Sequence, residues 1–372
     1  MRLRDLGIHV GQLAPGPLNA ITDVEGVRVG MTTLIEGEGP LEVGRGPVRT
    51  GVTVIVPHEG IAGEPVFAGC HRLNGNGELT GLEWVRESGQ LTTPVAITNT
   101  HSVGVVRDAL ALADAALHPE LGSYWSLPVV GETYDGMLND INGAHVRPEH
   151  VRRALASASD GPVPEGNVGG GTGMICHEFK GGTGTASRRL LPEQGGWTVG
   201  ALVQANHGER SRLMVDGVPV GREIGTDEVP SPYERPQETG SIIVILATDA
   251  PLLPHQCERL AQRAGLGIAR AGGAGAHSSG DLFLAFSTAN RGRLDPYKDE
   301  KEMPGEIVTV DMLPDGAITP LFWAAIEATE EAIYNALIAA ETMTGRDGVT
   351  AYALPHDRLL EVMARYGRGP SG

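Results

Sequence analysis

Residues 238–251 have the sequence ETGSIIVILATDAP. The unbroken apolar run at 242–247 is rich in β-branched residues and predicts a buried strand. The residues just before it are polar and rich in proline, which is typical of a loop. The strand therefore begins abruptly, directly after the dipeptide Gly240-Ser241.

A Gly-Ser bond at the edge of a strand is where a self-cleaving hydrolase would cut its own chain. Glycine lets the peptide adopt a conformation that other residues resist, and the Ser241 hydroxyl can attack the carbonyl carbon of Gly240. Cleavage would leave Ser241 as a new N-terminus that carries nucleophile and base on one residue. The chain has a second such dipeptide at Gly122-Ser123, and turn chemistry before a strand explains the first equally well. The dipeptide alone leaves both interpretations open.

The composition is that of an acidic, folded protein. The chain has 372 residues, of which 41% are hydrophobic, and a net charge of −17. This length suits two domains or one large α/β sandwich. Lys and Arg never cluster in runs longer than a pair, so a nucleic-acid partner is not expected.

The sequence shows no sign of export or of membrane insertion. No apolar run approaches the ~18 residues of a membrane-spanning helix, and the first residues, MRLRD, lack the apolar core of a signal peptide. Cys70, Cys176 and Cys257 are odd in number and widely spaced, which fits neither a disulfide framework nor a zinc motif. We therefore expect a cytoplasmic protein with reduced thiols and no membrane contact.

The common cofactor motifs are absent. The glycine cluster at 166–174 does not fit G-x-G-x-x-G, and without a Gly-Lys dipeptide the chain has no P-loop. Neither His58 nor His177, each followed by Glu, has a second His four residues later, and none of the 12 His residues forms a clear ligand cluster. We expect no metal and no other cofactor, with a metal enzyme left as an open alternative.

Strand and helix patterns mix along the chain without a strict βαβ rhythm. Strands are expected at 52–56, 95–98, 197–206, 241–247 and 282–287, and helices at 106–117, 254–265, from 319 onward and at 357–366. These patterns predict sheets covered by helices on their outer faces. Residues 207–239 contain Gly or Pro every few positions and indicate an exposed connector, where a chain can be cut without losing its core.

A small set of polar residues surrounds the Gly-Ser junction. Ser279 and Asp281 lead into the strand at 282–287, and two strands close in sequence and in one sheet would bring Ser279 near Ser241. Asn206 ends the strand before the connector, and its amide is a good oxyanion donor. Each also has an ordinary explanation as a turn residue. No G-x-S-x-G elbow is present, a dispersed Ser/His/Asp triad stays possible, and His277 is best explained as a residue closing a glycine turn.

Several segments, in this order along the chain, resemble one family. They are residues 16–24 (GPLNAITDV), 74–81 (NGNGELTG), 131–136 (GETYDG), 169–174 (GGGTGM), 203–206 (VQAN), 239–241 (TGS), 248–252 (TDAPL) and 279–281 (SGD). The family is that of the self-processing aminopeptidases of the S58 type, which include L-aminopeptidase/D-Ala-esterase/amidase and the β-peptidyl aminopeptidases. The resemblance spans most of the chain.

The resemblance implies an α/β protein with an αββα sandwich, similar in its layers to N-terminal nucleophile hydrolases but differently connected. It implies one domain over 1–372, cleaved into an α chain, 1–240, and a β chain, 241–372. The two chains would stay together and assemble as a homotetramer. The expected activity is release of N-terminal residues from peptides, amides or esters, with L-, D-Ala- or β-aminoacyl substrates left open.

The resemblance also implies roles for single residues. Ser241 is the nucleophile, Asn206 lies on the oxyanion side, and Tyr134 matches an active-site tyrosine. Ser279 matches a serine that forms a hydrogen bond near the nucleophile. Asp281 stands where family members have an acidic residue and would pair with the free amino group of the substrate. A free α-amine has a pKa near 7.7–8.0, so the amine of Ser241 can act as the base for its own hydroxyl.

Three alternatives remain beside this interpretation. Two of them are related enzyme types of the same fold, an acyltransferase and an endo-acting oligoamide hydrolase. The resemblance implies a Thr nucleophile for both, whereas this chain has Ser241. An uncleaved binding protein without catalysis is the third, and the intact set of Gly240, Ser241, Asn206 and Ser279 speaks against it.

Overall fold

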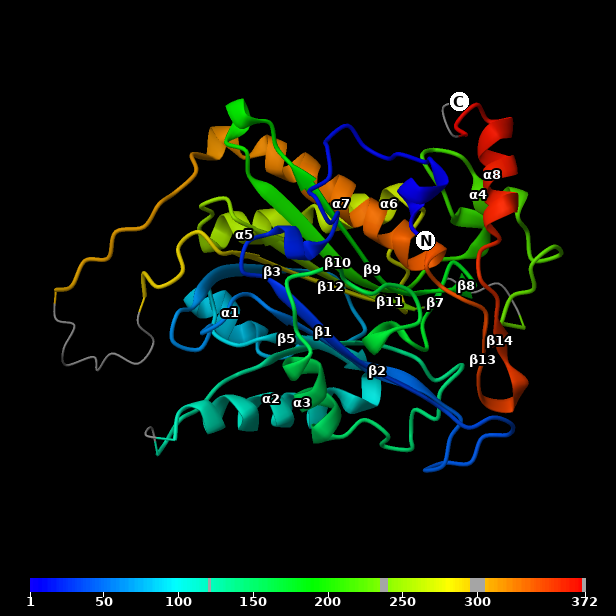
Figure 1. Ribbon diagram of the computed structural model, residues 1–372, viewed down its shortest axis with the longest axis horizontal. Helices are drawn as coiled ribbons and strands as arrows, with labels where there is room; N and C mark the ends of the chain where they lie inside the picture. The colour runs from blue at the N-terminus through cyan, green and yellow to red at the C-terminus, as the bar shows by residue number, and fades with distance from the viewer. Residues whose placement is uncertain (120–121, 235–239, 295–304, 370–372) are drawn as a thin grey trace.

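Two β-sheets lie face to face, and helices cover the outer face of each (Figure 1). This computed structural model describes residues 1–119, 122–234, 240–294 and 305–369. The arrangement is the αββα sandwich expected from the sequence, and that expectation is confirmed. One cluster of buried apolar side chains lies between the two sheets, and two others lie between each sheet and its helices.

The larger sheet has six strands in the order β4-β3-β12-β11-β10-β9. Its strands are β3 (Val66–Gly75), β4 (Gln90–Leu91), β9 (Gly182–Arg189), β10 (Thr198–Asn206), β11 (Ser241–Thr248) and β12 (Gly280–Ser287). Strands β11 and β12 run parallel, and β10 pairs with β11 in the antiparallel sense. The expected strand after the Gly-Ser junction is thus a central strand of this sheet.

The smaller sheet has four strands in the order β1-β2-β5-β6. They are β1 (Arg28–Glu36), β2 (Val48–Val56), β5 (Val95–Asn99) and β6 (Val129–Thr133). Two short hairpins complete the strands: β7 (Ile175–Cys176) with β8 (Phe179–Lys180), and β13 (Met343–Thr344) with β14 (Thr350–Ala351). The edge strand β6 runs parallel to β5 and brings its C-terminal end close to the larger sheet.

Helices lie on both sides of the stacked sheets (Figure 1). Helices α5 (Pro254–Gln262), α6 (Ala264–Arg270) and α7 (Thr319–Ile338) lie on the larger sheet, and α2 (Val103–Leu117) and α3 (Pro148–Ala156) lie on the smaller one. The remaining α-helices are α1 (Leu82–Ser88), α4 (Val220–Glu223) and α8 (His356–Arg365). The single helix expected at 254–265 is in fact two, α5 and α6, which are separated by Arg263.

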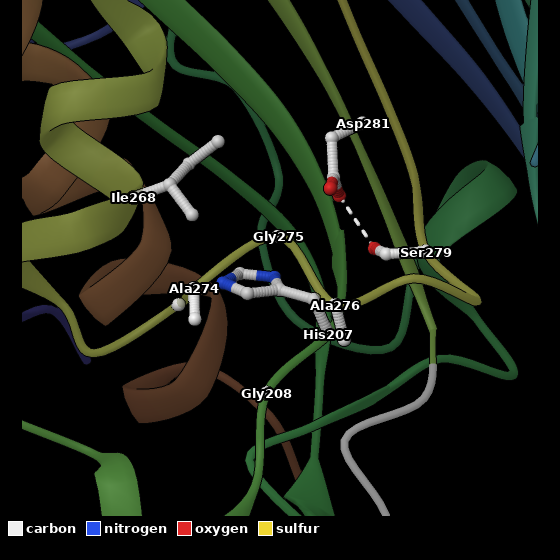
Figure 2. Close-up of a pocket in the computed structure, with 9 residues that line it drawn as sticks. His207, Gly208, Ile268, Ala274, Gly275, Ala276, Ser279 and Asp281 are labelled. Carbon is white, nitrogen blue, oxygen red and sulfur yellow. Dashed lines mark hydrogen bonds between the residues drawn. The ribbon is translucent and has the colours of Figure 1, made fainter. Parts of the chain in front are cut away.

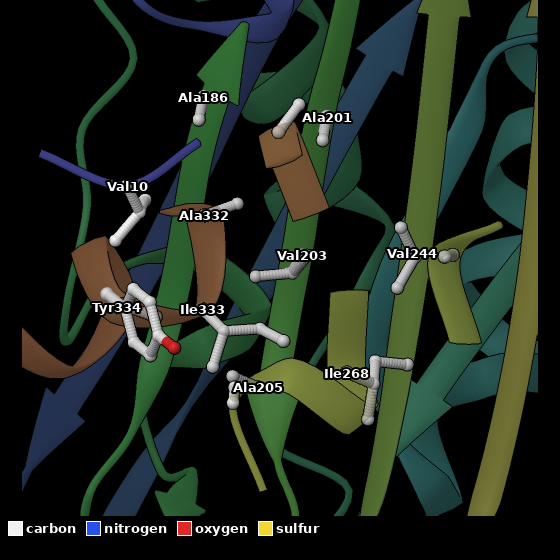
Figure 3. Close-up of a cluster of buried hydrophobic side chains, with 14 of the residues drawn as sticks. Val10, Ala186, Ala201, Val203, Ala205, Val244, Ile268, Ala332, Ile333 and Tyr334 are labelled. Atoms are coloured by element: carbon white, nitrogen blue, oxygen red, sulfur yellow. The ribbon is translucent and has the colours of Figure 1, made fainter. Parts of the chain in front are cut away.

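Strand β11 shows how the layers are built. Its side chains alternate between the two faces of the sheet: Ile243 and Ile245 pack between the sheets, whereas Ile242 and Val244 pack against the helices. Figure 3 shows part of this helix-side cluster, where Val203 and Val244 lie with residues of α6 and α7. By the same alternation, Ser241 belongs to the face between the sheets.

The expectation of an exposed connector at 207–239 is wrong for most of its described part. Val215, Val218, Val220 and Ile224 are buried in the helix-side core. Arg210 is also buried, and its guanidinium lies over the Phe179 ring, 3.4 Å from the ring centroid. The frequent Gly and Pro residues mark tight turns of a packed segment. Residues 235–239, directly before the Gly-Ser junction, lie outside the described residues.

Candidate active site

A cavity of about 690 Å³ opens at the end of the sandwich where β11 begins. Its walls come from both sheets and include Ser241, Asn206, Tyr134, Glu132 and the loop 75–78. The cavity therefore collects three of the five catalytic residues expected from the sequence and also Gly240 of the expected cleavage site. Tyr134 and Ser241 meet there although they are more than 100 positions apart in the chain.

Ser241 is the first residue of β11 and is largely buried. It stands between the last residue of β10 and the first of β12, because its register partners are Asn206 and Gly280. The backbone N–H of Gly280 donates a hydrogen bond to Ser241 Oγ at 3.2 Å. The oxygen is thus held by the neighbouring strand β12.

Gly240, the residue before it, occupies a position that only glycine fits. Its φ is +129°, a conformation that L side chains rarely adopt. A Cβ atom built at this position would lie 1.8 Å from the carbonyl oxygen of Asn206. Steric crowding by β10 therefore demands glycine on the N-terminal side of the bond to Ser241.

The Asn206 side chain is held from both ends. Its Oδ1 accepts a hydrogen bond from the backbone N–H of Ile175 at 2.8 Å, and its Nδ2 donates to the carbonyl oxygen of Tyr134 at 3.0 Å. A side-chain amide has two N–H groups, so one of them remains for an acceptor in the cavity that Asn206 lines.

Tyr134 follows β6 and is 48% exposed, with its ring at the cavity wall. The ring needs a glycine beside it, because a Cβ atom at Gly136 would lie 2.4 Å from the Tyr134 hydroxyl oxygen. The backbone below is fixed by Asp135, which accepts hydrogen bonds from Asn99 and Asn139. Burial raises the pKa of the Asp135 carboxyl to about 6.

Ser279 and Asp281 lie on the other face of the larger sheet. Asp281 is the register partner of Ile242, which packs against the helices. The Ser279 hydroxyl donates to Asp281 Oδ1 at 2.6 Å, and Asn74 Nδ2 donates to Oδ2 at 3.0 Å. With His207 and Ile268, both line a separate, water-sized cavity of about 10 Å³ (Figure 2).

This placement does not fit the role expected for Asp281. The sequence-based interpretation had Asp281 pairing with a substrate amine next to Ser241, but its carboxylate is turned to the helix side and both oxygens accept hydrogen bonds from side chains of the protein. Ser279 adjoins Gly280, whose N–H contacts Ser241 Oγ. In this structure the Asp281 carboxylate thus contacts Ser279 and Asn74 and lines the small cavity, whereas Ser241 lines the large one.

Glu132, which lines the cavity together with Glu78, is a carboxylate that the sequence interpretation did not single out. It lies on β6, accepts hydrogen bonds from the Thr100 hydroxyl and from the backbone N–H of Glu78, and lines the cavity with Ser241. Burial raises the pKa of Glu132 above its ordinary value of 4.5. The signal was present in residues 131–136, GETYDG, where Glu132 stands two residues before Tyr134.

Residues 19–351 match the model of Peptidase family S58. The chain belongs to this family. It is 50% identical to "Beta-peptidyl aminopeptidase BapA" of Sphingosinicella microcystinivorans, over 99% of this chain and 93% of that protein. The S58 chain is therefore a peptidase, and so a hydrolase.

Two solved structures have the same fold as this S58 peptidase over 99% of both chains. The "Burkholderia sp. beta-aminopeptidase" is 54% identical with a TM-score of 0.89. The "l-aminopeptidase d-ala-esterase/amidase from ochrobactrum anthropi" is 46% identical with a TM-score of 0.87 and is described as a new variant of the Ntn hydrolase fold. The likeness agrees with the sandwich seen here.

Among the described residues of this S58 peptidase, one group has the chemistry of a metal site. Cys176, His177 and His207 are buried, and their potential ligand atoms lie within 4.8 Å of one another. The sequence interpretation missed them because residues 176 and 207 are 31 positions apart and form no spacing motif. No helix in the described ranges is long and apolar enough to cross a membrane.

Proposed function

We propose that this S58 peptidase is a serine aminopeptidase that cleaves itself between Gly240 and Ser241 and then releases N-terminal residues from peptides, amides or esters. The observation that carries the proposal is the position of Ser241. Its side chain faces a large cavity at the start of a central strand, and the residue before it has space only for glycine. A buried serine with no other role in the core fits a nucleophile.

The self-cleavage step is an acyl shift followed by hydrolysis. Ser241 Oγ attacks the carbonyl carbon of Gly240, the C–N bond breaks, and Gly240 becomes an ester on Oγ while the nitrogen of Ser241 takes up a proton. Water then hydrolyses the ester and yields the carboxyl end of 1–240. The support for this step is the Gly280 N–H, which holds Oγ at 3.2 Å, and the positive φ of Gly240.

The freed amine of Ser241 then serves as the base for the same hydroxyl. A terminal α-amine titrates near pH 7.7–8.0, so it can take the proton of Oγ during attack on the substrate and return it to the leaving amine. The acyl group would be released by water. The free N–H of the Asn206 amide would stabilise the oxyanion, a contribution on the order of 10²–10³ in kcat.

Glu132 is the residue we propose for binding the substrate amine. Its carboxylate lies in the same cavity as Ser241, it is fixed by two hydrogen bonds, and a buried carboxylate favours a cationic partner. An ammonium held there leaves the first amide bond of a peptide for the nucleophile, which accounts for a preference for N-termini. Asp281 is assigned a positioning role, through the Ser279 hydroxyl.

The names of the relatives suggest a substrate range. A protein named for β-peptides and one named for L-amino acids and D-Ala esters or amides are both about half identical to this chain. We extend these three substrate classes to it as candidates. After cleavage the chains 1–240 and 241–372 would stay associated, and we expect four such pairs in a cytoplasmic homotetramer.

The test combines denaturing mass spectrometry with an aminoacyl p-nitroanilide assay. The purified protein should give two masses, with serine at the N-terminus of the smaller chain, and Ser241→Ala should give one mass and no hydrolysis. Ser123→Ala removes the hydroxyl from the other Gly-Ser dipeptide and should change neither result. An uncleaved wild type would favour a binding protein, and transfer to an added amine faster than hydrolysis would favour an acyltransferase.

A further inference from the structure

The turn between β7 and β8 is unusual for a buried segment. His177 and Glu178 form its tip, both have positive φ values, +48° and +62°, and both are almost fully buried. Such two-residue turns favour Asn and Gly, because other residues are strained there. Each of the two also has a buried polar atom without a hydrogen-bond partner, His177 Nε2 and Glu178 Oε2. Strain and unsatisfied polar atoms therefore coincide at one site.

His207 adds a second buried histidine to the same place. Its Nδ1 lies 3.9 Å from the Cys176 sulfur, and its ring also lines the small cavity at Ser279 and Asp281. The rings of His177 and His207 meet edge to face, with centroids 5.3 Å apart. Two buried imidazoles and a thiol thus converge, at a cost to stability that apolar residues of similar size would avoid.

We propose that Cys176, His177 and His207 bind one zinc ion that fastens the β7–β8 hairpin to the end of β10. His177 Nδ1 is engaged with the carbonyl oxygen of Glu209 at 3.0 Å, which leaves Nε2 as its ligand atom. His207 would use Nδ1, the atom nearest the Cys176 sulfur. With Zn–N and Zn–S bonds of about 2.0–2.3 Å, a tetrahedral ion places its ligand atoms close to the separation seen here.

The charge states of the three side chains suit this ion. Burial lowers the pKa of His177 to about 4 and that of His207 to about 3, so both rings are neutral and offer a lone pair. Burial raises the pKa of Cys176 to about 12, and a bound zinc ion would displace the thiol proton, since only the thiolate ligates. Thiolate with imidazole is a donor set that zinc prefers. A water molecule would complete the tetrahedron.

The site lies directly behind the proposed oxyanion residue. The hairpin residue Ile175 donates its N–H to Asn206 Oδ1, and His207 is the next residue after Asn206. A zinc ion that joins residues 176, 177 and 207 would fix both segments that hold the Asn206 amide. Because all three ligands are buried, the ion would be taken up as the chain folds.

The test is the metal content of protein produced in zinc-supplemented medium, with Cys176→Ser as the key variant. Cys257→Ser is the matched control, because Cys257 is also fully buried but lies on α5, away from both histidines. We expect ~1 zinc per chain in the wild type and in Cys257→Ser, and loss of zinc from Cys176→Ser. Ser241→Ala, expected to be inactive, should keep its zinc, which separates this proposal from the catalytic one.

Cobalt substitution gives a second measurement that does not depend on the fold of one variant. Protein produced with Co²⁺ should show a thiolate-to-cobalt charge-transfer absorption band, retained in Cys257→Ser and lost in Cys176→Ser and in His177→Gln. Folded wild-type protein that holds neither zinc nor cobalt, or holds an equal amount in Cys176→Ser, would overturn the proposal.

Discussion

Gly240 fits its position tightly and also forms the bond that we propose is cleaved. Its substitution should therefore have a large effect on the rate of cleavage. A methyl group at Gly240 would lie 1.8 Å from the Asn206 carbonyl oxygen. This clash would displace the carbonyl carbon of residue 240 from Ser241 Oγ. We expect Gly240→Ala to slow cleavage at least ~100-fold, because a displacement of about 1 Å has that effect on a reacting pair. The fraction of cleaved chain over time measures this. Gly122→Ala, at an open position with no atom within 4 Å of the added Cβ, should cleave like the wild type.

Glu132 should control the affinity for substrate and its pH dependence. Because burial raises its pKa above 4.5, the carboxyl takes up a proton at a higher pH than an ordinary glutamate. The neutral form cannot pair with an ammonium group, so KM should rise as the pH falls through this pKa. Glu132→Gln should raise KM by on the order of tenfold or more at neutral pH. The KM of this variant should not change further as the pH falls below neutral.

The control for this prediction is Glu87→Gln, which removes an exposed carboxylate from α1 and should leave KM unchanged. Steady-state rates with a peptide substrate over a range of pH give both KM and kcat. A Glu132→Gln variant with the wild-type KM at neutral pH would show that the substrate amine binds elsewhere.

Ser279 and Asp281 should behave as one unit that acts on kcat. The Asp281 carboxylate accepts a hydrogen bond from the Ser279 hydroxyl and faces the helices, away from the large cavity. Ser279→Ala and Asp281→Asn should therefore each lower kcat with little change in KM, and the double variant should lose no more than the worse single one. A double-mutant cycle on kcat and KM measures this. A rise in KM for Asp281→Asn alone would restore the amine-binding role expected from the sequence.

The alternation of side chains explains which site residues the sequence could place. Ser241 begins strand β11, whose odd-numbered residues Ile243 and Ile245 face the smaller sheet. The inward direction of its side chain therefore follows from the two-residue period of a strand. Asp281 is the partner of Ile242 and faces the helices. That register could not be read from the sequence, because it depends on how β11 and β12 pair.

The elements with the clearest apolar patterns were found, but strands β1, β3, β6 and β9 and helix α3 were not predicted, and the segment after β10 was predicted wrongly. The strand at 241–247 and the helices near 319 and 357 are present within a few residues of their expected bounds. Residues 207–229 are instead fixed by buried Arg210, which donates to the carbonyl oxygens of Glu178 and Val229 at 2.9 Å. Such contacts join segments distant in sequence and leave no local pattern.

Helix α7 gives a prediction about stability. It is buried on nearly all sides, and two of its carboxylates, Glu327 and Glu331, meet the fully buried Arg188 of β9 at 3.1 and 2.7 Å. Arg188→Met would leave two buried charges without this partner and should lower the free energy of unfolding by about 3–5 kcal/mol.

Urea unfolding monitored by circular dichroism measures this loss. Arg189→Met is the control, because Arg189 is the next residue on β9 but is exposed, and its effect should stay within about 0.5 kcal/mol. Equal stability of the two variants would mean that α7 is held on the sheet by its apolar contacts alone.

The layers of the sandwich were expected from the resemblance. Which residues from distant segments come together in the fold was not. The hydrophobic pattern supplies strands with two buried faces, which need cover on both sides. It does not say that Cys176 and His207 meet, or that β6 of the smaller sheet brings Glu132 to the cavity at Ser241. Those meetings follow from the order of strands in the two sheets.

That strand order leads to a prediction about the cleaved protein. In the larger sheet β11 and β12 from residues 241–372 lie between β10 and β3 from residues 1–240. Separating the two chains would break two strand pairings and open the core on both faces of the sheet, a loss far larger than the stability of a typical domain. Cleavage at Gly240-Ser241 should therefore leave one native particle.

Native mass spectrometry should show equal numbers of both chains in every species, four of each in the assembled protein, and the uncleaved Ser241→Ala variant should form a particle of the same size. The chains should part only in denaturant, and free 241–372 chain under native conditions would contradict the interleaved sheet.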